Sequence, residues 1–113
     1  MAPVGILFDA AGLAGVTAPL RPYRAVDDCL VRNPWNADNI AAHLPKPPEI
    51  VTVPGDHFVF LAPCPRRMAA RFPAACQDPP GVDRAAIHAQ IAAELVAFFR
   101  RTLGPGPAPP EKH

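Results

Sequence analysis

The residues best suited to chemistry are an acidic pair, Asp27 and Asp28, and a histidine, His57, each of which follows a short apolar segment. A carboxylate that accepts the Nδ1–H of an imidazole fixes the tautomer of the ring and stabilises the imidazolium formed on proton transfer. In open parallel sheets, catalytic groups collect just past the carboxyl ends of the strands. If both apolar segments are parallel strands, the sequence predicts an acid and a general base side by side.

The segments that would position these residues are candidate strands at 20–25 and 49–53. The first contains Pro22, which cannot donate to a sheet and favours an edge position. The second reads Glu-Ile-Val-Thr-Val, a β-branched run typical of a buried parallel strand. A further short apolar segment, 2–8, is predicted to be the end of a strand that runs into a loop.

Two helices are predicted around these strands. Asn33 and Pro34 form a favourable start for the first, because Asn can cap a helix and Pro gives up a donor that would be unpaired anyway. This helix is expected to run to His43 or Leu44. Asp83 caps the second, whose apolar side chains recur every three to four residues and form one stripe: Ile87, Ile91, Leu95, Phe98 and Thr102.

The order strand, helix, strand, helix predicts the α/β class, with parallel pairing through a right-handed crossover. A sheet of two or three strands leaves strand edges and one apolar helix face without a neighbour. The sequence is therefore expected to be an incomplete part of a larger sheet that is marginally stable alone or self-associates. Trp35 and the phenylalanines are expected to pack in the core or against loops.

Irregular structure is predicted where prolines and glycines gather. The chain has 17 prolines and 7 glycines, and the segment 62–81 is expected to be a surface excursion with a turn of helix near 68–71. Cys64 and Cys76 bracket this excursion. The sequence is compatible with two alternatives, a disulfide between them or a pair of buried free thiols. The segment 104–113, nearly devoid of apolar side chains, is predicted to be a disordered tail.

Two turns of the sequence carry a family resemblance. The segment Val53-Pro-Gly-Asp-His57-Phe-Val-Phe-Leu-Ala-Pro63 resembles the histidine loop of α/β-hydrolases, and Tyr23-Arg-Ala-Val-Asp-Asp28-Cys-Leu-Val31 resembles the acid turn that precedes it. The longer match is similar to predicted dienelactone hydrolases and includes three more segments: Asn33-Pro-Trp-Asn36, Phe60-Leu-Ala-Pro-Cys64 and Asp78-Pro-Pro-Gly-Val-Asp-Arg84. The resemblance implies that residues 1–103 form the C-terminal strand-helix-strand-helix part of a hydrolase domain.

The resemblance also implies roles for two residues: His57 as the general base and Asp28 as the acid that orients it, in the chain order serine, acid, histidine. The implied reaction is hydrolysis of a small carboxylic ester or lactone, without a cofactor.

The family usually has a small residue where Asp56 stands, and the loop is about one residue short, so a displaced His57 is one expectation. The chain contains no serine and no Gly-x-Ser-x-Gly or Gly-x-Cys-x-Gly segment. The chain alone is therefore predicted to be inactive, and Met1 would correspond to an internal position of the family.

Two other functions stay open: a non-enzymatic binding or dimerising module that uses the sheet edge, and a cysteine hydrolase acting through Cys29 or Cys64. His43, His88 and His113 are expected to be solvated, and no cysteine or histidine spacing is typical of a zinc site.

Composition bears on partners and location. With 11 basic and 10 acidic residues, nothing favours nucleic acid or anionic membranes. No apolar run approaches the roughly 18 residues of a membrane span. The lack of a signal peptide favours the cytoplasm for the chain as given, although the parent of such a fragment could be exported.

Overall fold

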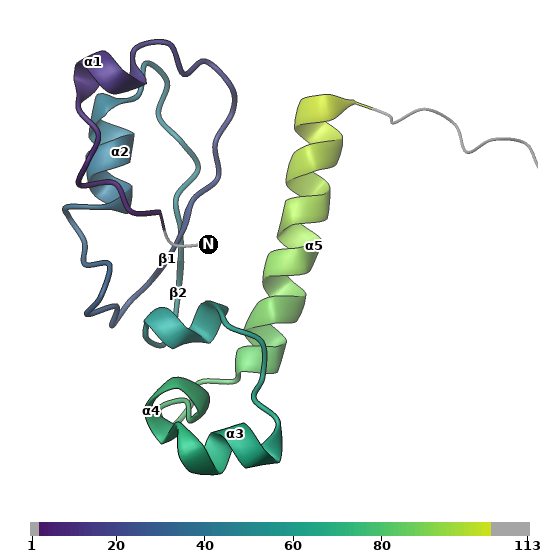
Figure 1. The fold of residues 1–113 in the computed structure, drawn as a ribbon. Helices are drawn as coiled ribbons and strands as arrows, with labels where there is room; N and C mark the ends of the chain where they lie inside the picture. The colour runs from purple at the N-terminus through teal and green to yellow at the C-terminus, as the bar shows by residue number, and fades with distance from the viewer. Residues whose placement is uncertain (1–2, 105–113) are drawn as a thin grey trace, which may run out of the picture.

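The computed structural model describes residues 3–104 and combines two short strands with several helices (Figure 1). In chain order the elements are α1 (Ala10–Leu13), β1 (Tyr23–Ala25), α2 (Ala37–His43), β2 (Val51–Val53), the 3-10 helix η1 (His57–Phe60), α3 (Arg66–Arg71), α4 (Pro73–Cys76) and α5 (Arg84–Leu103). In the view of Figure 1, α1 and α2 lie on one side of the strands and α5 on the other, whereas α3 and α4 lie beyond the end of β2.

The two strands are parallel neighbours, with Tyr23 opposite Val51 and Ala25 opposite Val53. The predicted parallel pairing is therefore confirmed, and the chain is a small mixed α/β structure. Helix α2 lies between the two strands in the sequence, as a parallel connection requires. Each strand has one strand neighbour within the part of the chain that the structure describes, so each also has one open edge.

Both strands are shorter than the predicted ranges 20–25 and 49–53. The backbone is nevertheless already paired before the strands begin, because Glu49 N donates to Leu20 O at 3.0 Å. Pro22 precedes β1 and takes part through its carbonyl oxygen alone, which accepts a hydrogen bond from β2. This fits a residue without an N–H, which can contribute only an acceptor to a ladder.

The core lies where the strands, η1 and α5 meet. Its buried members are Tyr23, Ala25, Val53, Val59 and Ile87. Tyr23 and Ala25 are alternate residues of β1, and both are buried, which places them on the face that packs against the rest of the core. The predicted stripe of α5 supplies Ile87 as a buried member, and Ile91 and Leu95 pack against the cluster while partly exposed.

Helix α5 begins at the predicted cap. The Asp83 side chain accepts a hydrogen bond from Ala86 N at 3.0 Å, which satisfies one of the donors left open at a helix start. The helix ends at Gly104, whose positive φ of 72° is a conformation that glycine adopts at little cost. Of the predicted tail at 104–113, only Gly104 lies within the described residues.

A polar cluster connects the start of β1 to α5. The Tyr23 hydroxyl donates to Glu94 Oε2 at 2.9 Å, and Arg21 donates to the same oxygen at 3.0 Å. Burial raises the pKa of the Tyr23 hydroxyl. The Gln90 amide, followed by Arg21 and Tyr23, lowers the pKa of the Glu94 carboxyl. The cluster thus holds the middle of α5 against the sheet through hydrogen bonds to an ionised carboxylate.

Two predictions of secondary structure are wrong: a strand within residues 2–8 and the start of helix α2. The described part of the segment 2–8 contains no strand, because its backbone bonds to side chains instead: Gly5 N donates to Asn36 Oδ1 at 2.9 Å. A Cβ on Gly5 would lie 2.2 Å from the Asn36 carbonyl oxygen, so only glycine allows this approach. Helix α2 starts at Ala37 rather than at Pro34, since the amide of Asn36 also donates to Arg32 O at 2.9 Å and belongs to a turn.

The irregular excursion forms a small disulfide-closed unit. Cys64 and Cys76 are bonded, so the disulfide alternative is confirmed, and a helix lies close to the predicted turn of helix near 68–71. Neither α3 nor α4 contains a buried residue. The buried Arg84 fastens the unit to α5 by donating to Asp78 Oδ1 at 2.7 Å and to Ala75 O at 3.1 Å. The disulfide and this arginine therefore replace a hydrophobic core in holding the unit.

Reduction of the disulfide should lower the free energy of unfolding by about 3 kcal/mol, the value for closing a loop of this length in the unfolded chain. The exchange of backbone amides in α3 and α4 should accelerate before that of α5. Denaturant titration with and without reductant measures the first effect and hydrogen exchange the second.

In the oxidised protein, an alkylating reagent should modify Cys29 alone. Three equally reactive thiols would contradict the disulfide.

Much apolar surface stays exposed. Among residues 3–104, thirteen large hydrophobic residues are exposed, whereas eight hydrophobic residues are buried. Contrary to expectation, Trp35 is 55% exposed, and Phe8, Phe72 and Phe99 are about half exposed.

Candidate functional site

Two adjacent turns at the carboxyl ends of the strands build the site. Sheet pairing continues past the strands, because Val26 N donates to Val53 O at 2.9 Å and Asp27 N donates to Gly55 O at 3.0 Å. Gly55 has a positive φ of 97°, which lets the chain turn sharply after β2. The two turns are thus fixed to each other by backbone hydrogen bonds before any side chain contributes.

Asp28 lies buried in the first turn with both carboxylate oxygens occupied. Its Oδ1 accepts hydrogen bonds from Leu30 N at 3.0 Å and from Val31 N at 2.7 Å, which fixes the side chain to its own turn. Its Oδ2 lies 2.8 Å from Nδ1 of His57. The carboxylate can only accept, so Nδ1 donates and a neutral His57 keeps Nε2 as its proton acceptor.

His57 is the first residue of η1, and Asp56 is the residue that caps this short helix. The Asp56 side chain caps η1 by accepting a hydrogen bond from Phe58 N at 2.9 Å. Asp56 is therefore used in its own turn, and His57 lies within hydrogen-bond distance of Asp28. The His57 side chain is 32% exposed, whereas that of Asp28 is 1% exposed. A buried acid behind a partly exposed imidazole is the arrangement that leaves the outer ring nitrogen accessible to a ligand.

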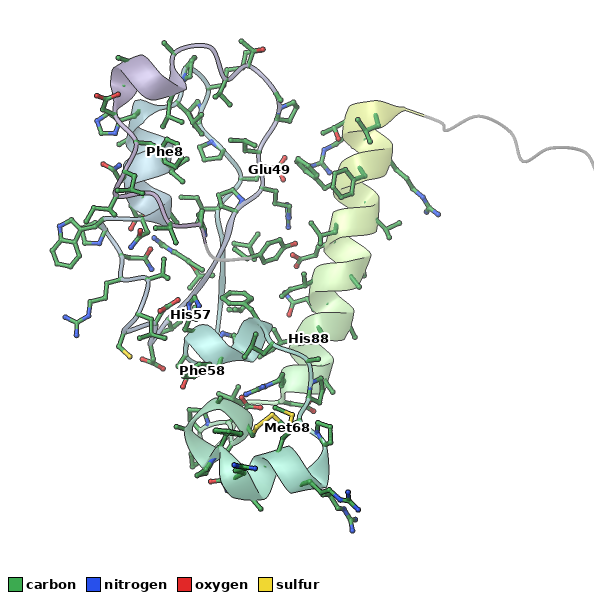
Figure 2. The ribbon with its side chains drawn as sticks, viewed as in Figure 1. Phe8, Glu49, His57, Phe58, Met68 and His88 are labelled. Atoms are coloured by element: carbon green, nitrogen blue, oxygen red, sulfur yellow. A yellow bond between two sulfur atoms is a disulfide. The ribbon has the colours of Figure 1, made fainter. Side chains whose placement is uncertain are left out.

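A pocket of about 530 Å³ lies between η1 and α5 next to this pair, and Figure 2 labels His57 and His88 in the two elements. Its lining is mainly apolar and consists of His57, Phe60, Leu61, His88, Ile91, Ala92 and Leu95. The volume falls within the range of sites for small molecules, and such sites combine apolar walls with few polar groups. The arrangement can hold a small apolar molecule beside a histidine that can take up a proton.

The structure brings one unpredicted residue to the site. His88, expected to be solvated, is partly buried and donates from Nε2 to Val59 O at 2.8 Å. This bond connects α5 to η1 and so holds one wall of the pocket to the other. The sequence did contain a signal: His88 precedes Ile91 by three residues and Leu95 by seven, which places it on the apolar face of the helix.

The other candidate residues lie apart from this pair. Asp27 is exposed, whereas the carboxylate that lies against Nδ1 of His57 belongs to Asp28. Cys29 is a free, exposed thiol, whereas Cys64 is held in the disulfide and offers no thiolate. His43 interacts with Asn39 O of its own helix.

Two further observations concern the described residues as a whole. Within residues 3–104, histidine, cysteine and acidic side chains nowhere gather in a group of three that could hold a metal ion. No helix in the same range has the length and hydropathy that crossing a bilayer requires. His113 lies outside the described residues.

The chemistry available at the site is proton transfer by one histidine that a buried carboxylate orients. Acid and base follow two neighbouring parallel strands in that order along the chain. Comparison of the chain with known protein families, with curated proteins and with solved structures finds no match.

Proposed function

We propose that the chain is the C-terminal, acid-and-base part of an α/β-hydrolase that resembles dienelactone hydrolases and cleaves small carboxylic esters or lactones. His57 is the general base, and Asp28 orients it. The 2.8 Å contact between Nδ1 of His57 and Oδ2 of Asp28 is the single observation that carries this proposal.

The proposed reaction needs a nucleophile that this sequence lacks. Nε2 of His57 would take the proton of a serine or cysteine as that residue attacks the ester carbonyl, and would later return it to the leaving alcohol. Asp28 would stabilise the imidazolium formed in between. The chain contains no serine, and its one free thiol, Cys29, follows directly on the acid rather than standing in an elbow between strand and helix.

Reading the coding DNA upstream of the Met1 codon in all three frames tests the proposal. We expect a strand-turn-helix with Gly-x-Ser-x-Gly or Gly-x-Cys-x-Gly, and we expect the protein that includes it to hydrolyse esters. In that protein, His57→Ala should lower kcat by a factor of 10³ or more. The proposal fails if no frame encodes such an elbow, or if hydrolysis survives His57→Ala unchanged.

The chain by itself should show no esterase activity above background, because a base without a nucleophile and an oxyanion hole cannot form an acyl-enzyme. Release of nitrophenol from a nitrophenyl ester measures this directly, with His57→Ala as the comparison. Turnover that disappears in the variant would contradict the expected inactivity and show that the chain supplies its own catalytic groups.

A non-enzymatic module for binding or self-association is the second candidate function, and the exposed apolar residues favour it. The open edges of β1 and β2 could each accept another strand. Sizing chromatography across a range of concentrations distinguishes the two functions. A stable dimer that masks His57 from solvent would favour the module over the hydrolase part.

A further inference from the structure

The pocket beside His57 has a polar end and an apolar body. His57 and His88 provide the polar groups, and the remaining lining residues are Phe60 and Leu61 near η1 and Ile91, Ala92 and Leu95 on α5. The wall that α5 contributes to the pocket extends from His88 to Leu95. This is about two helical turns, or roughly 10 Å along the axis, which is close to the length of an extended chain of about eight carbons. The apolar body therefore suits a straight aliphatic chain that lies along the helix.

Hydrogen bonds to the protein determine what the two histidines can offer a ligand. Nδ1 of His57 donates to Asp28, and Nε2 of His88 donates to Val59 O. In the neutral form of each ring, the other nitrogen is then an acceptor. A ligand with a proton to give matches this polar end, and a carboxylic acid gives its proton to a neutral imidazole. The resulting carboxylate and imidazolium form a charge-assisted pair.

From these observations we infer that the pocket binds a straight-chain aliphatic monocarboxylic acid of about eight carbons, with its carboxyl group at Nε2 of His57 and its chain along Ile91, Ala92 and Leu95. Binding places one proton on Nε2, supplied by the acid itself or, when the carboxylate binds, by solvent, and the carboxylate stays paired with the imidazolium. This inference rests on the proposed function, because such an acid is the product of hydrolysing its ester. It specifies the substrate class as esters of medium-chain aliphatic acids.

Two neighbouring alanines on α5 provide a matched pair of variants. Ala92 lines the pocket and Ala93 does not, and both are exposed. Replacing either with Phe adds the same side chain at an exposed helix position, so both variants should fold. Ala92→Phe fills the space that the aliphatic chain would occupy, whereas Ala93→Phe leaves that space open.

The test measures binding of sodium octanoate to the isolated chain by calorimetry, with the ¹⁵N resonances of the His57 ring as a second readout. We expect the affinity to rise by up to about fourfold per methylene from butanoate to octanoate. Ala92→Phe should weaken octanoate binding at least tenfold, and Ala93→Phe should change it less than twofold. Octanoate should shift the Nε2 resonance of His57 toward its protonated position.

Three results would overturn the inference. Octylammonium binding as tightly as octanoate would show an apolar surface without a carboxyl site. Equal effects of Ala92→Phe and Ala93→Phe would place the ligand elsewhere. Absence of octanoate binding would remove the ligand class while leaving the proposed function intact, because that function is tested by the upstream elbow and the effect of His57→Ala.

Discussion

Asp28→Asn should shift the proton of His57 from Nδ1 to Nε2. The Asn side chain can still accept from Leu30 N and Val31 N through its oxygen, so the turn should keep its shape. Its amide group would then face Nδ1 of His57 as a donor and favour the tautomer with the proton on Nε2. Loss of a hydrogen bond to a charged group is worth about 1.5–3 kcal/mol, so the ratio of the two tautomers should change by a factor of about 10 to 150.

Long-range ¹H–¹⁵N correlation of the histidine ring measures this ratio in the chain as it is. Asp27→Asn is the matched control, because it removes the neighbouring, exposed carboxylate and should leave the tautomer unchanged. In a complete hydrolase, Asp28→Asn should lower kcat on the order of 10⁴-fold, as expected when the base of a triad holds the wrong tautomer. An unchanged tautomer ratio would show that Asp28 does not orient His57.

Tyr23→Ala should lower the free energy of unfolding by about 3–5 kcal/mol, the usual cost of removing a buried aromatic side chain. Tyr23 is 1% exposed and is among the largest fully buried side chains. Small domains have only about 5–15 kcal/mol of stability in total, so this variant should be largely unfolded at moderate denaturant concentration. Circular dichroism during denaturant titration provides the measurement.

Tyr23→Phe separates packing from hydrogen bonding at the same position. It keeps the ring in the core and removes only the hydroxyl that donates to Glu94, so its expected cost is about 1–3 kcal/mol. Equal effects of the two variants would show that the polar cluster with Glu94, rather than the buried ring, holds α5 to the sheet. A loss below about 1 kcal/mol in Tyr23→Ala would contradict the core described above.

The parts of the fold that the sequence predicts are those that local pattern determines. Helix α5 is marked by the Asp83 cap and an apolar repeat, and both signals lie within the segment itself. The contact between Asp28 and His57 was expected because both residues follow strands that pair in parallel, and their side chains are indeed within hydrogen-bond distance. The catalytic roles of the two residues remain part of the proposed function.

The parts that the sequence does not predict depend on partners far along the chain. Asn36 directly precedes helix α2 in the sequence. Its side chain nevertheless accepts a hydrogen bond from Gly5 N, 31 residues away. Nothing near Gly5 in the sequence indicates that partner. His88 was expected in solvent because a lone helical histidine is most often exposed, whereas its position relative to Ile91 already placed it on the inner face of α5.

The parallel pairing of β1 and β2 also determines when the acid–base pair can form. Arg24 and Thr52 on the two strands are 28 residues apart, and Asp28 and His57 are 29 apart. The unfolded chain must close a loop of about 30 residues before either contact exists, and such non-local parallel pairings form slowly compared with a helix such as α5. During folding, α5 can therefore appear while Asp28 and His57 are still independent, and the oriented histidine emerges only in the step that closes the sheet.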